Sequence, residues 1–183
     1  LKCRVDLHRC GEATLGLRDI TKTQGVEPDV GVDDRRQRIE PEGIAHVRGG
    51  QEKGRRWYKS GKMEHKTNTF RDFIACGEHL AAAGFTRRGN IVAQGGSAGG
   101  MLVGAVANLA PDLFRGIVAE VPFVDVLTTM LDDTLPLTPP EWPEWGNPIA
   151  SKAAYEAIAA YSPYDRVEAK SYPHILAVGG LTD

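Results

Sequence analysis

A serine stands within a glycine-rich turn, and this turn constrains the fold more than any other feature of the sequence. Residues 95–99 read GGSAG and fit the pattern Gly-x-Ser-x-Gly around Ser97. An apolar run at residues 90–94 precedes the turn, and an apolar pattern with helical spacing follows it at residues 101–109. A serine held between a strand and a helix in this way is typical of a nucleophile elbow, in which the hydroxyl stands above the end of a sheet.

The small residues around Ser97 have a physical reason. Side chains at positions 95 and 99 would collide with the strand and the helix that flank the sharp turn. The backbone N–H of Ala98, at the start of the helix, can then stabilise a developing oxyanion. The alternative is a glycine-rich turn that cradles a phosphate. The sequence favours it less, because no lysine follows the glycines and the spacing Gly-x-Gly-x-x-Gly is missing.

Strand-like and helix-like segments alternate from residue 44 onward. We expect strands at 44–48, 90–94, 114–123 and 172–180, helices at 68–83, 101–109, 124–132 and 152–160, and a proline-rich loop at 136–148. This alternation predicts an α/β fold with a doubly wound, mostly parallel sheet. Residues 1–43 hold no aromatic residue and many charges, so we interpret them as poorly specified, with weak strand or helix content only at 13–20.

The composition excludes several classes of protein. A net charge of −2 gives no reason to expect nucleic acid as a partner, and no apolar run approaches the roughly 20 residues of a membrane span. The three cysteines form no zinc-binding pattern, so we expect free thiols, no metal and no cofactor. We also find no apolar core of a secretory signal near the start of the chain, and we expect a cytoplasmic protein.

A serine hydrolase with this elbow also needs an acid and a histidine, in the chain order serine, acid, histidine. Asp183 follows the last expected strand, where the acid belongs, although a solvated loop carboxylate is the alternative by position alone. All five histidines precede Asp183. Without an imidazole to accept the proton, the serine hydroxyl is a poor nucleophile.

Several short segments are similar to the catalytic domain of oligopeptidase B, a serine peptidase in the prolyl oligopeptidase family. They are IAHVRGG at 44–50, GRRWY at 54–58, NTFRDFIAC at 68–76, GGSAGG at 95–100, EWGNP at 144–148, YSPYD at 161–165 and GLTD at 180–183. The resemblance therefore covers residues 44–183. It implies a partial catalytic domain of the α/β-hydrolase fold at 44–183, incomplete at both ends, and leaves 1–43 outside the family pattern.

The resemblance also implies roles for single residues. Ser97 is the nucleophile, Asp183 is the triad acid, and Ala98 contributes to the oxyanion hole. The triad histidine of the family lies beyond the acid, and the family's N-terminal β-propeller, which restricts access to short peptides, is not found in this sequence. We therefore expect short peptides as partners in the reaction, and little or no activity from the chain as printed.

Oligopeptidase B enzymes cut after Arg or Lys, which implies acidic residues in the pocket for the P1 side chain. Glu141 matches the first pocket acid of the family, while Pro143 stands at the second position with Glu144 beside it. The alternative is that both glutamates are solvated loop charges. Trp142 and Trp145 are expected to anchor this loop rather than to line a pocket.

Two other interpretations remain open. An α/β-hydrolase esterase can use the same elbow, although the family segments outside the elbow favour a peptidase. The second interpretation is a non-catalytic, truncated remnant, because a sheet without its opening strands exposes an unpaired edge.

Overall fold

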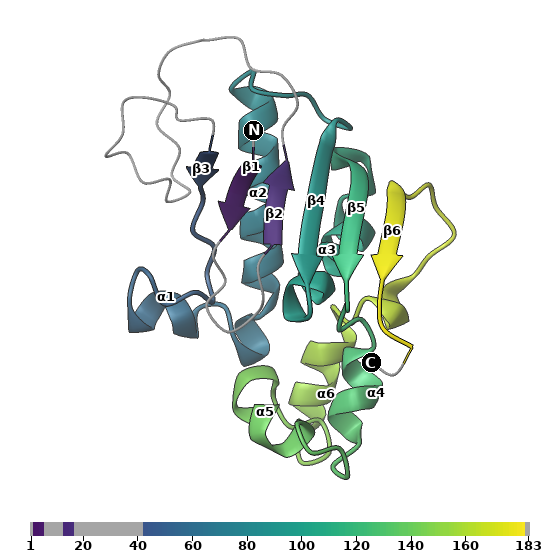
Figure 1. The fold of residues 1–183 in the computed structure, drawn as a ribbon. Helices are drawn as coiled ribbons and strands as arrows, with labels where there is room; N and C mark the ends of the chain where they lie inside the picture. Colours follow the sequence, from purple (N-terminus) through teal and green to yellow (C-terminus); the bar gives the residue numbers. More distant parts are fainter. Residues whose placement is uncertain (1, 6–12, 17–41, 182–183) are drawn as a thin grey trace.

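The computed structural model of the chain describes residues 2–5, 13–16 and 42–181 (Figure 1). Its strands form one sheet in the spatial order β3-β1-β2-β4-β5-β6. The strands are β1 Lys2–Val5, β2 Ala13–Gly16, β3 Glu42–Ile44, β4 Ile91–Gly96, β5 Phe114–Glu120 and β6 His174–Val178. Strand β2 runs antiparallel to both of its neighbours, and the other pairs are parallel. The sheet is therefore mostly parallel, as the alternation of elements predicts.

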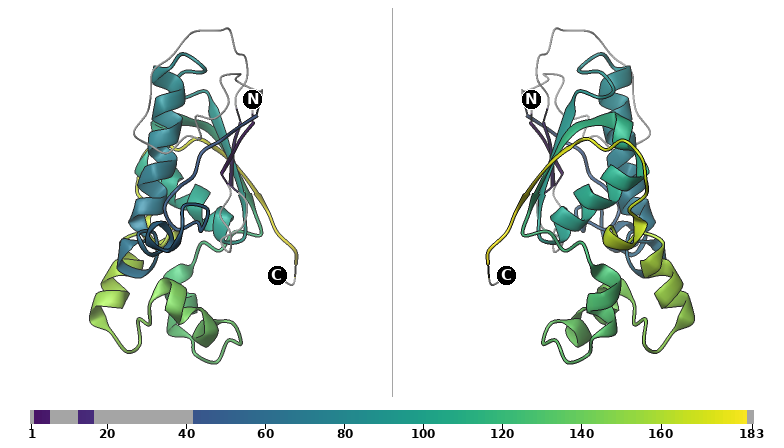
Figure 2. Two further views of the ribbon diagram at one scale, coloured as in Figure 1. Left: turned by 90° about the vertical axis from the view of Figure 1, so that its left-hand side faces the viewer. Right: turned by 90° about the vertical axis from the view of Figure 1, so that its right-hand side faces the viewer.

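The helices fall into two groups along the chain. They are α1 Arg55–Lys59, α2 Thr67–Ala82, α3 Ala98–Leu109, α4 Val126–Leu131, α5 Thr138–Trp145 and α6 Lys152–Ala159, with 3-10 turns η1 Met63–His65, η2 Pro111–Leu113 and η3 Tyr164–Arg166. Helices α2 and α3 pack on one face of the sheet, and α4, α5 and α6 lie below it (Figures 1 and 2). Across residues 2–5, 13–16 and 42–181, no helix has the length and apolar character needed to cross a bilayer.

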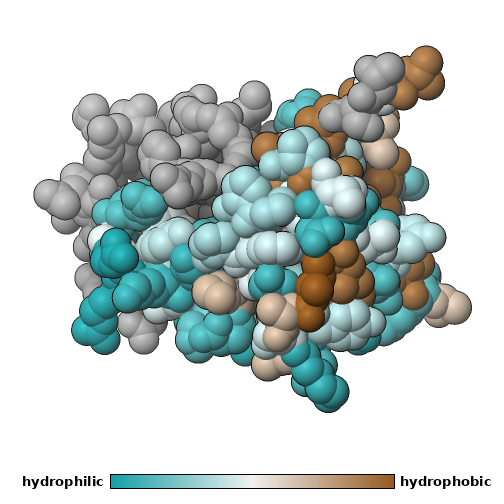
Figure 3. Space-filling model, turned by 90° about the horizontal axis from the view of Figure 1, so that it is seen from below, coloured by the Kyte–Doolittle hydropathy of each residue, from teal (hydrophilic) through white to brown (hydrophobic). Residues whose placement is uncertain are grey.

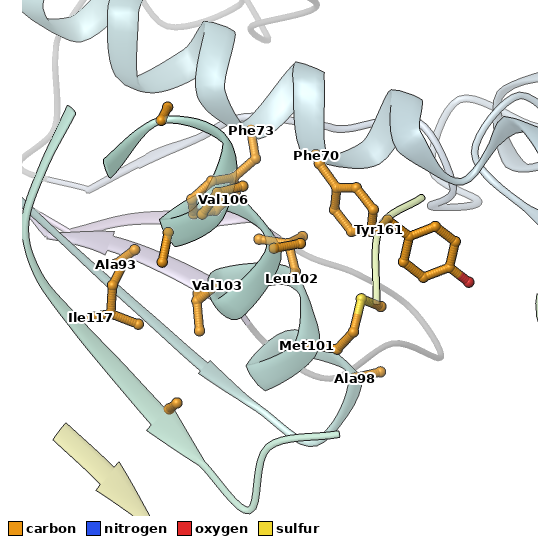
Figure 4. Packing of buried hydrophobic residues seen from close by; sticks show 14 of the residues in the cluster. Phe70, Phe73, Ala93, Ala98, Met101, Leu102, Val103, Val106, Ile117 and Tyr161 are labelled. Carbon is orange, nitrogen blue, oxygen red and sulfur yellow. The ribbon is translucent and has the colours of Figure 1, made fainter. Parts of the chain in front are cut away.

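The hydrophobic core lies between the sheet and helices α2 and α3. Strand β4 alternates buried and exposed residues, with Ile91 and Ala93 fully buried, because one face of the sheet meets the helices. Phe70 and Phe73 of α2 point toward α3 and the sheet (Figure 4). Helix α3 is apolar around most of its surface, which fits its position between α2 and the sheet.

The parallel strands bring distant segments to one edge of the sheet. In the register of β4, β5 and β6, Gly96 pairs with Glu120, and Glu120 pairs with Val178. The three strands therefore end together, and the residues that follow them share the lower edge in Figure 1. Ligands of open α/β sheets bind at this carboxyl edge.

Most elements expected from residue 44 onward are confirmed, but several differ. The strand expected at 44–48 is displaced, because β3 covers Glu42–Ile44 and ends where that strand was expected to begin. Residues 136–148 are not only a loop, because α5 forms within them; Pro139 and Pro140 occupy its first turn, where a helix needs no N–H donor. Strand β1 forms where the sequence predicted no regular structure, and α1 was not expected. The weak signal at residues 13–20 corresponds to β2.

Candidate active site

Ser97 occupies a strained backbone conformation between β4 and α3. Its φ is 53° and its ψ is −118°, a region that residues with a side chain rarely adopt. Three backbone hydrogen bonds hold it there: its N–H donates to the Glu120 carbonyl (2.9 Å), and its carbonyl accepts from the N–H groups of Met101 (3.1 Å) and Phe123 (3.0 Å). Strain of this kind persists only where surrounding contacts impose it, and it concentrates at functional sites.

Two glycines make the turn sterically feasible. A Cβ at Gly95 would lie 2.2 Å from the Gly99 carbonyl oxygen, and a Cβ at Gly100 would lie 2.6 Å from the Pro122 Cα. Both are collisions with backbone atoms, which cannot rotate away. The expected collision across the turn is therefore present at Gly95, and Gly100 adds a contact with the segment after β5 that the motif did not predict.

The side chain of Ser97 is exposed, while Ala98 behind it is buried. Ala98 is the first residue of α3, where a helix leaves its N–H groups without intrahelical acceptors and carries partial positive charge. A negative oxygen held near Ser97 therefore meets a backbone donor and a favourable helix dipole. Within the described part of the chain, no residue, histidines included, forms a hydrogen bond with the Ser97 hydroxyl.

The acid position lies on the same edge of the sheet. Strand β6 ends at Val178, two strands from the elbow, and its carbonyl accepts from the Val121 N–H (2.6 Å). Asp183, the expected triad acid, follows this strand but lies outside the described residues. The structure thus brings the end of β6 to the elbow's edge, and the contact of Asp183 itself stays a prediction.

A second strained residue stands beside the elbow. Val121, the residue after β5, has a φ of 40°, although it is β-branched and precedes a proline, both of which disfavour a positive φ. No local sequence signal predicts this conformation. It follows from long-range contacts, since the neighbouring Ser97 and Val178 both bond to this turn.

An aromatic pair connects the elbow to α5. The ring of Phe123, whose N–H bonds Ser97, meets the ring of Trp145 edge-on, with 5.7 Å between the centroids. The Trp145 indole Nε1–H donates to Glu141 Oε2 (2.6 Å), and both residues belong to α5. The expected pocket acid Glu141 is half-buried and hydrogen-bonded rather than a freely solvated charge.

Glu144 has different surroundings. Its Oε2 accepts from the Tyr58 hydroxyl (2.5 Å), and its Oε1 lies 3.7 Å from the Lys66 ammonium. These contacts attach α5 to the segment that precedes α2. The anchoring expected of the tryptophans is present at Trp142, whose indole N–H donates to the Met130 carbonyl (3.2 Å) of α4.

The glycine loop after β3 is held by a partly buried ion pair. Arg48 contacts Asp72 of α2 through its backbone N–H (2.9 Å), Nε (2.8 Å) and one terminal nitrogen (2.6 Å). The hydrogen bond with Asp72 raises the pKa of the Arg48 guanidinium. This arginine therefore supports the loop. Among the residues that the structure describes, no three potential metal ligands cluster together.

With this geometry established, comparison with known proteins identifies the family. The sequence matches the prolyl oligopeptidase family of serine peptidases (peptidase S9) over residues 43–183. The chain belongs to the prolyl oligopeptidase family. It is 56% identical to Protease 2 of Moraxella lacunata over 139 residues, and 52% identical to dipeptidyl aminopeptidase BI of Pseudoxanthomonas mexicana over 140 residues. Each match covers 76% of this chain, and the chain spans only about one fifth of either relative (20% and 19%).

Solved structures of the prolyl oligopeptidase family show the same fold. Oligopeptidase B from Leishmania major matches with a TM-score of 0.71 and 51% identity, over 74% of this chain and 19% of that protein. Oligopeptidase B from Trypanosoma brucei, solved in a closed form with covalently bound antipain, matches with a TM-score of 0.71 and 53% identity over the same shares. The expected α/β-hydrolase fold is therefore confirmed, as a partial domain.

Sequence reasoning missed the residues that join α5 to the rest of the site. Phe123 and Lys66 were not singled out, because neither belongs to a local motif and their partners are distant in the sequence. The strand–turn–helix pattern correctly predicted the turn at Ser97 and the helix that begins at Ala98, and the catalytic roles of both residues stay predictions. For Phe123, the one available signal was its place just after β5, at the carboxyl edge of the sheet.

Proposed function

We propose that this chain carries the nucleophile and oxyanion-binding part of a serine oligopeptidase that cuts short peptides after basic residues. The observation that supports it best is the strained Ser97 elbow at the carboxyl edge of a mostly parallel sheet, in a chain of the prolyl oligopeptidase family. The backbone geometry presents the hydroxyl to solvent, where a peptide carbonyl can reach it.

In the proposed reaction, the Ser97 oxygen attacks the scissile carbonyl carbon and forms the tetrahedral intermediate. The serine proton passes to the triad histidine, which in the family lies beyond the acid and which Asp183 orients. The Ala98 N–H donates to the oxyanion, and the intermediate then expels the amine, which takes the proton from that histidine. Water hydrolyses the acyl-enzyme by the same steps in reverse order.

Glu141 is the proposed acceptor for a basic P1 side chain. It is connected to the elbow through Trp145 and Phe123, and its Oε2 is already held by the indole. A carboxylate with one fixed hydrogen bond keeps lone pairs for a charge-assisted bond to an arginine or lysine. Glu144 is the second proposed contact, although its hydrogen bond from Tyr58 and its ion pair with Lys66 make it the less available of the two.

The test uses a chimera in which residues 43–183 replace the matching segment of Moraxella lacunata Protease 2. We expect a fluorophosphonate to label the chimera, and Ser97→Ala to abolish labelling. We expect Glu141→Gln to lower kcat/KM for an arginyl peptide amide about tenfold or more, the loss of one charge-assisted contact, and to leave a leucyl amide nearly unchanged. An arginine-to-leucine ratio equal to that of the parent chimera would refute the role of Glu141.

The esterase alternative is tested with the same protein. A simple ester cleaved far faster than any peptide amide, with no effect of Glu141→Gln, would favour an esterase. The cytoplasmic location expected from the cysteine content stays a prediction.

A further inference from the structure

Lys66 breaks two local rules at once. Its side chain is almost completely buried (2% exposed), although an ammonium is costly to remove from water. It also stands at the N-cap of α2, where the helix dipole disfavours a positive charge, and the first turn of α2 contains no acidic residue to offset it. Residues that violate local preferences in this way often serve a function.

Two contacts of the Lys66 ammonium are with residues of α5. It lies 3.7 Å from Glu144 Oε1 and 4.5 Å from the centre of the Trp145 ring. A cation over an indole is a favourable electrostatic arrangement, and it is stronger when water is excluded. The Tyr58 hydroxyl bonds the other oxygen of Glu144, so that carboxylate is fixed as well. The charge of Lys66 therefore helps to hold one side of α5.

The same indole also contacts Glu141. One face of Trp145 receives the Lys66 ammonium, its edge meets Phe123, and its N–H donates to Glu141 Oε2. We propose that Lys66 is a positioning residue, which fixes the Trp145 indole and through it the Glu141 carboxylate, and so sets the preference for a basic P1 side chain. This inference rests on the proposed function of Glu141.

The physical basis is pre-organisation. A free glutamate loses side-chain entropy when it pairs with a ligand cation. A glutamate whose oxygen is already bonded to a fixed indole has lost part of that freedom before the ligand arrives. If Lys66 is removed, the indole keeps its contact with Phe123 but loses its cation, and its N–H is no longer held toward Glu141.

The test uses the 183-residue chain labelled with ¹⁵N and the variant Lys66→Met, which keeps the length of the side chain and removes its charge. The first readout is the indole N–H resonance of Trp145, identified by its loss in Trp145→Phe. We expect this resonance at low field in the parent, because the carboxylate bond is short, and at higher field in Lys66→Met. The second readout is the affinity for N-acetyl-arginine amide, measured by NMR titration and compared with N-acetyl-norleucine amide.

We expect Lys66→Met to weaken binding of the arginine amide about tenfold, the loss of one oriented charge-assisted bond, with no change for norleucine. Lys59→Met is the control. Lys59 carries the same charge at the exposed end of α1, and among the described residues its side chain forms no hydrogen bond or ion pair. It should leave both readouts unchanged.

Trp145→Phe is the second variant, in case Lys66→Met does not fold as judged by circular dichroism. It keeps a ring against Phe123 and removes only the donor to Glu141, so it should lose the arginine preference too. An arginine preference retained in both variants would overturn the positioning role of Lys66 and would leave the proposed P1 role of Glu141 unaffected. A parent chain that binds both amides equally would refute the P1 role of Glu141 and this inference with it.

Discussion

At the scale of single residues, the elbow depends on a neighbouring glycine that has no Cβ atom. The backbone of Ser97 bends so tightly that the Gly95 Cα faces the Gly99 carbonyl, and a single methyl group there has no space. Gly96, one residue later in the same strand, is different: a Cβ there would lie 3.7 Å from the Glu120 carbonyl oxygen, an ordinary contact. The two glycines look equivalent in the sequence and differ in the structure.

This difference predicts that the same glycine-to-alanine substitution has a large effect on stability at position 95 and a small one at position 96. Gly95→Ala should destabilise the chain by about 3 kcal/mol, because the backbone must move to relieve the overlap. Gly96→Ala should change stability by less than about 1 kcal/mol, because an alanine in a strand costs little. Urea denaturation of both variants measures the two values. Equal stabilities would show that the turn is not as tight as its geometry indicates.

At the scale of elements, α5 shows why sequence patterns can mislead. Five prolines between residues 136 and 148 indicate a loop when each is counted as a helix breaker. Pro139 and Pro140 lie in the first turn, however, where their missing N–H groups have no intrahelical partner in any case. The elbow was predictable because its signal is local, whereas α5 depends on Glu144 meeting Tyr58, 86 residues away.

Pro143 is the one proline of α5 that lies beyond the first turn, and replacing it tests the proposed P1 pocket. It occupies the position expected for the second acid of the proposed pocket, and its missing N–H removes a helical hydrogen bond. Pro143→Glu in the chimera should raise the arginine-to-leucine ratio of kcat/KM about tenfold, because an arginine fork suits two acceptors. Pro143→Gln repairs the helix without the charge and is the control. An equal rise of the ratio in Pro143→Glu and Pro143→Gln would contradict the binding of the P1 arginine by a second carboxylate.

At the scale of the whole molecule, the sheet has one well-covered face and one exposed strand. Helices α2 and α3 cover β4 and β5, while every residue of β6 is exposed. Seen from below, hydrophobic residues gather on the side where β6 lies (Figure 3). The order of β4, β5 and β6 follows from their local patterns and the parallel connection rule. Local patterns predict the strand β6, whereas its exposure depends on which elements pack against it.

An exposed apolar edge strand predicts self-association of the 183-residue chain. Within the described residues β6 pairs with β5 alone, so one row of its N–H and carbonyl groups has no partner strand, and Ile175, Leu176 and Val178 are 57%, 58% and 49% exposed. Such an edge pairs readily with another chain, and a lysine on it blocks pairing.

Sedimentation velocity over a range of concentrations should therefore show oligomers for the parent chain and mostly monomer for Leu176→Lys. Leu109→Lys is the matched control, because Leu109 is 56% exposed at the end of α3, away from the edge. If the edge drives association, this control should associate like the parent, since the added charge is the same and only its place differs. A parent chain that stays monomeric at all concentrations, or equal effects of the two lysines, would show that β6 does not template pairing.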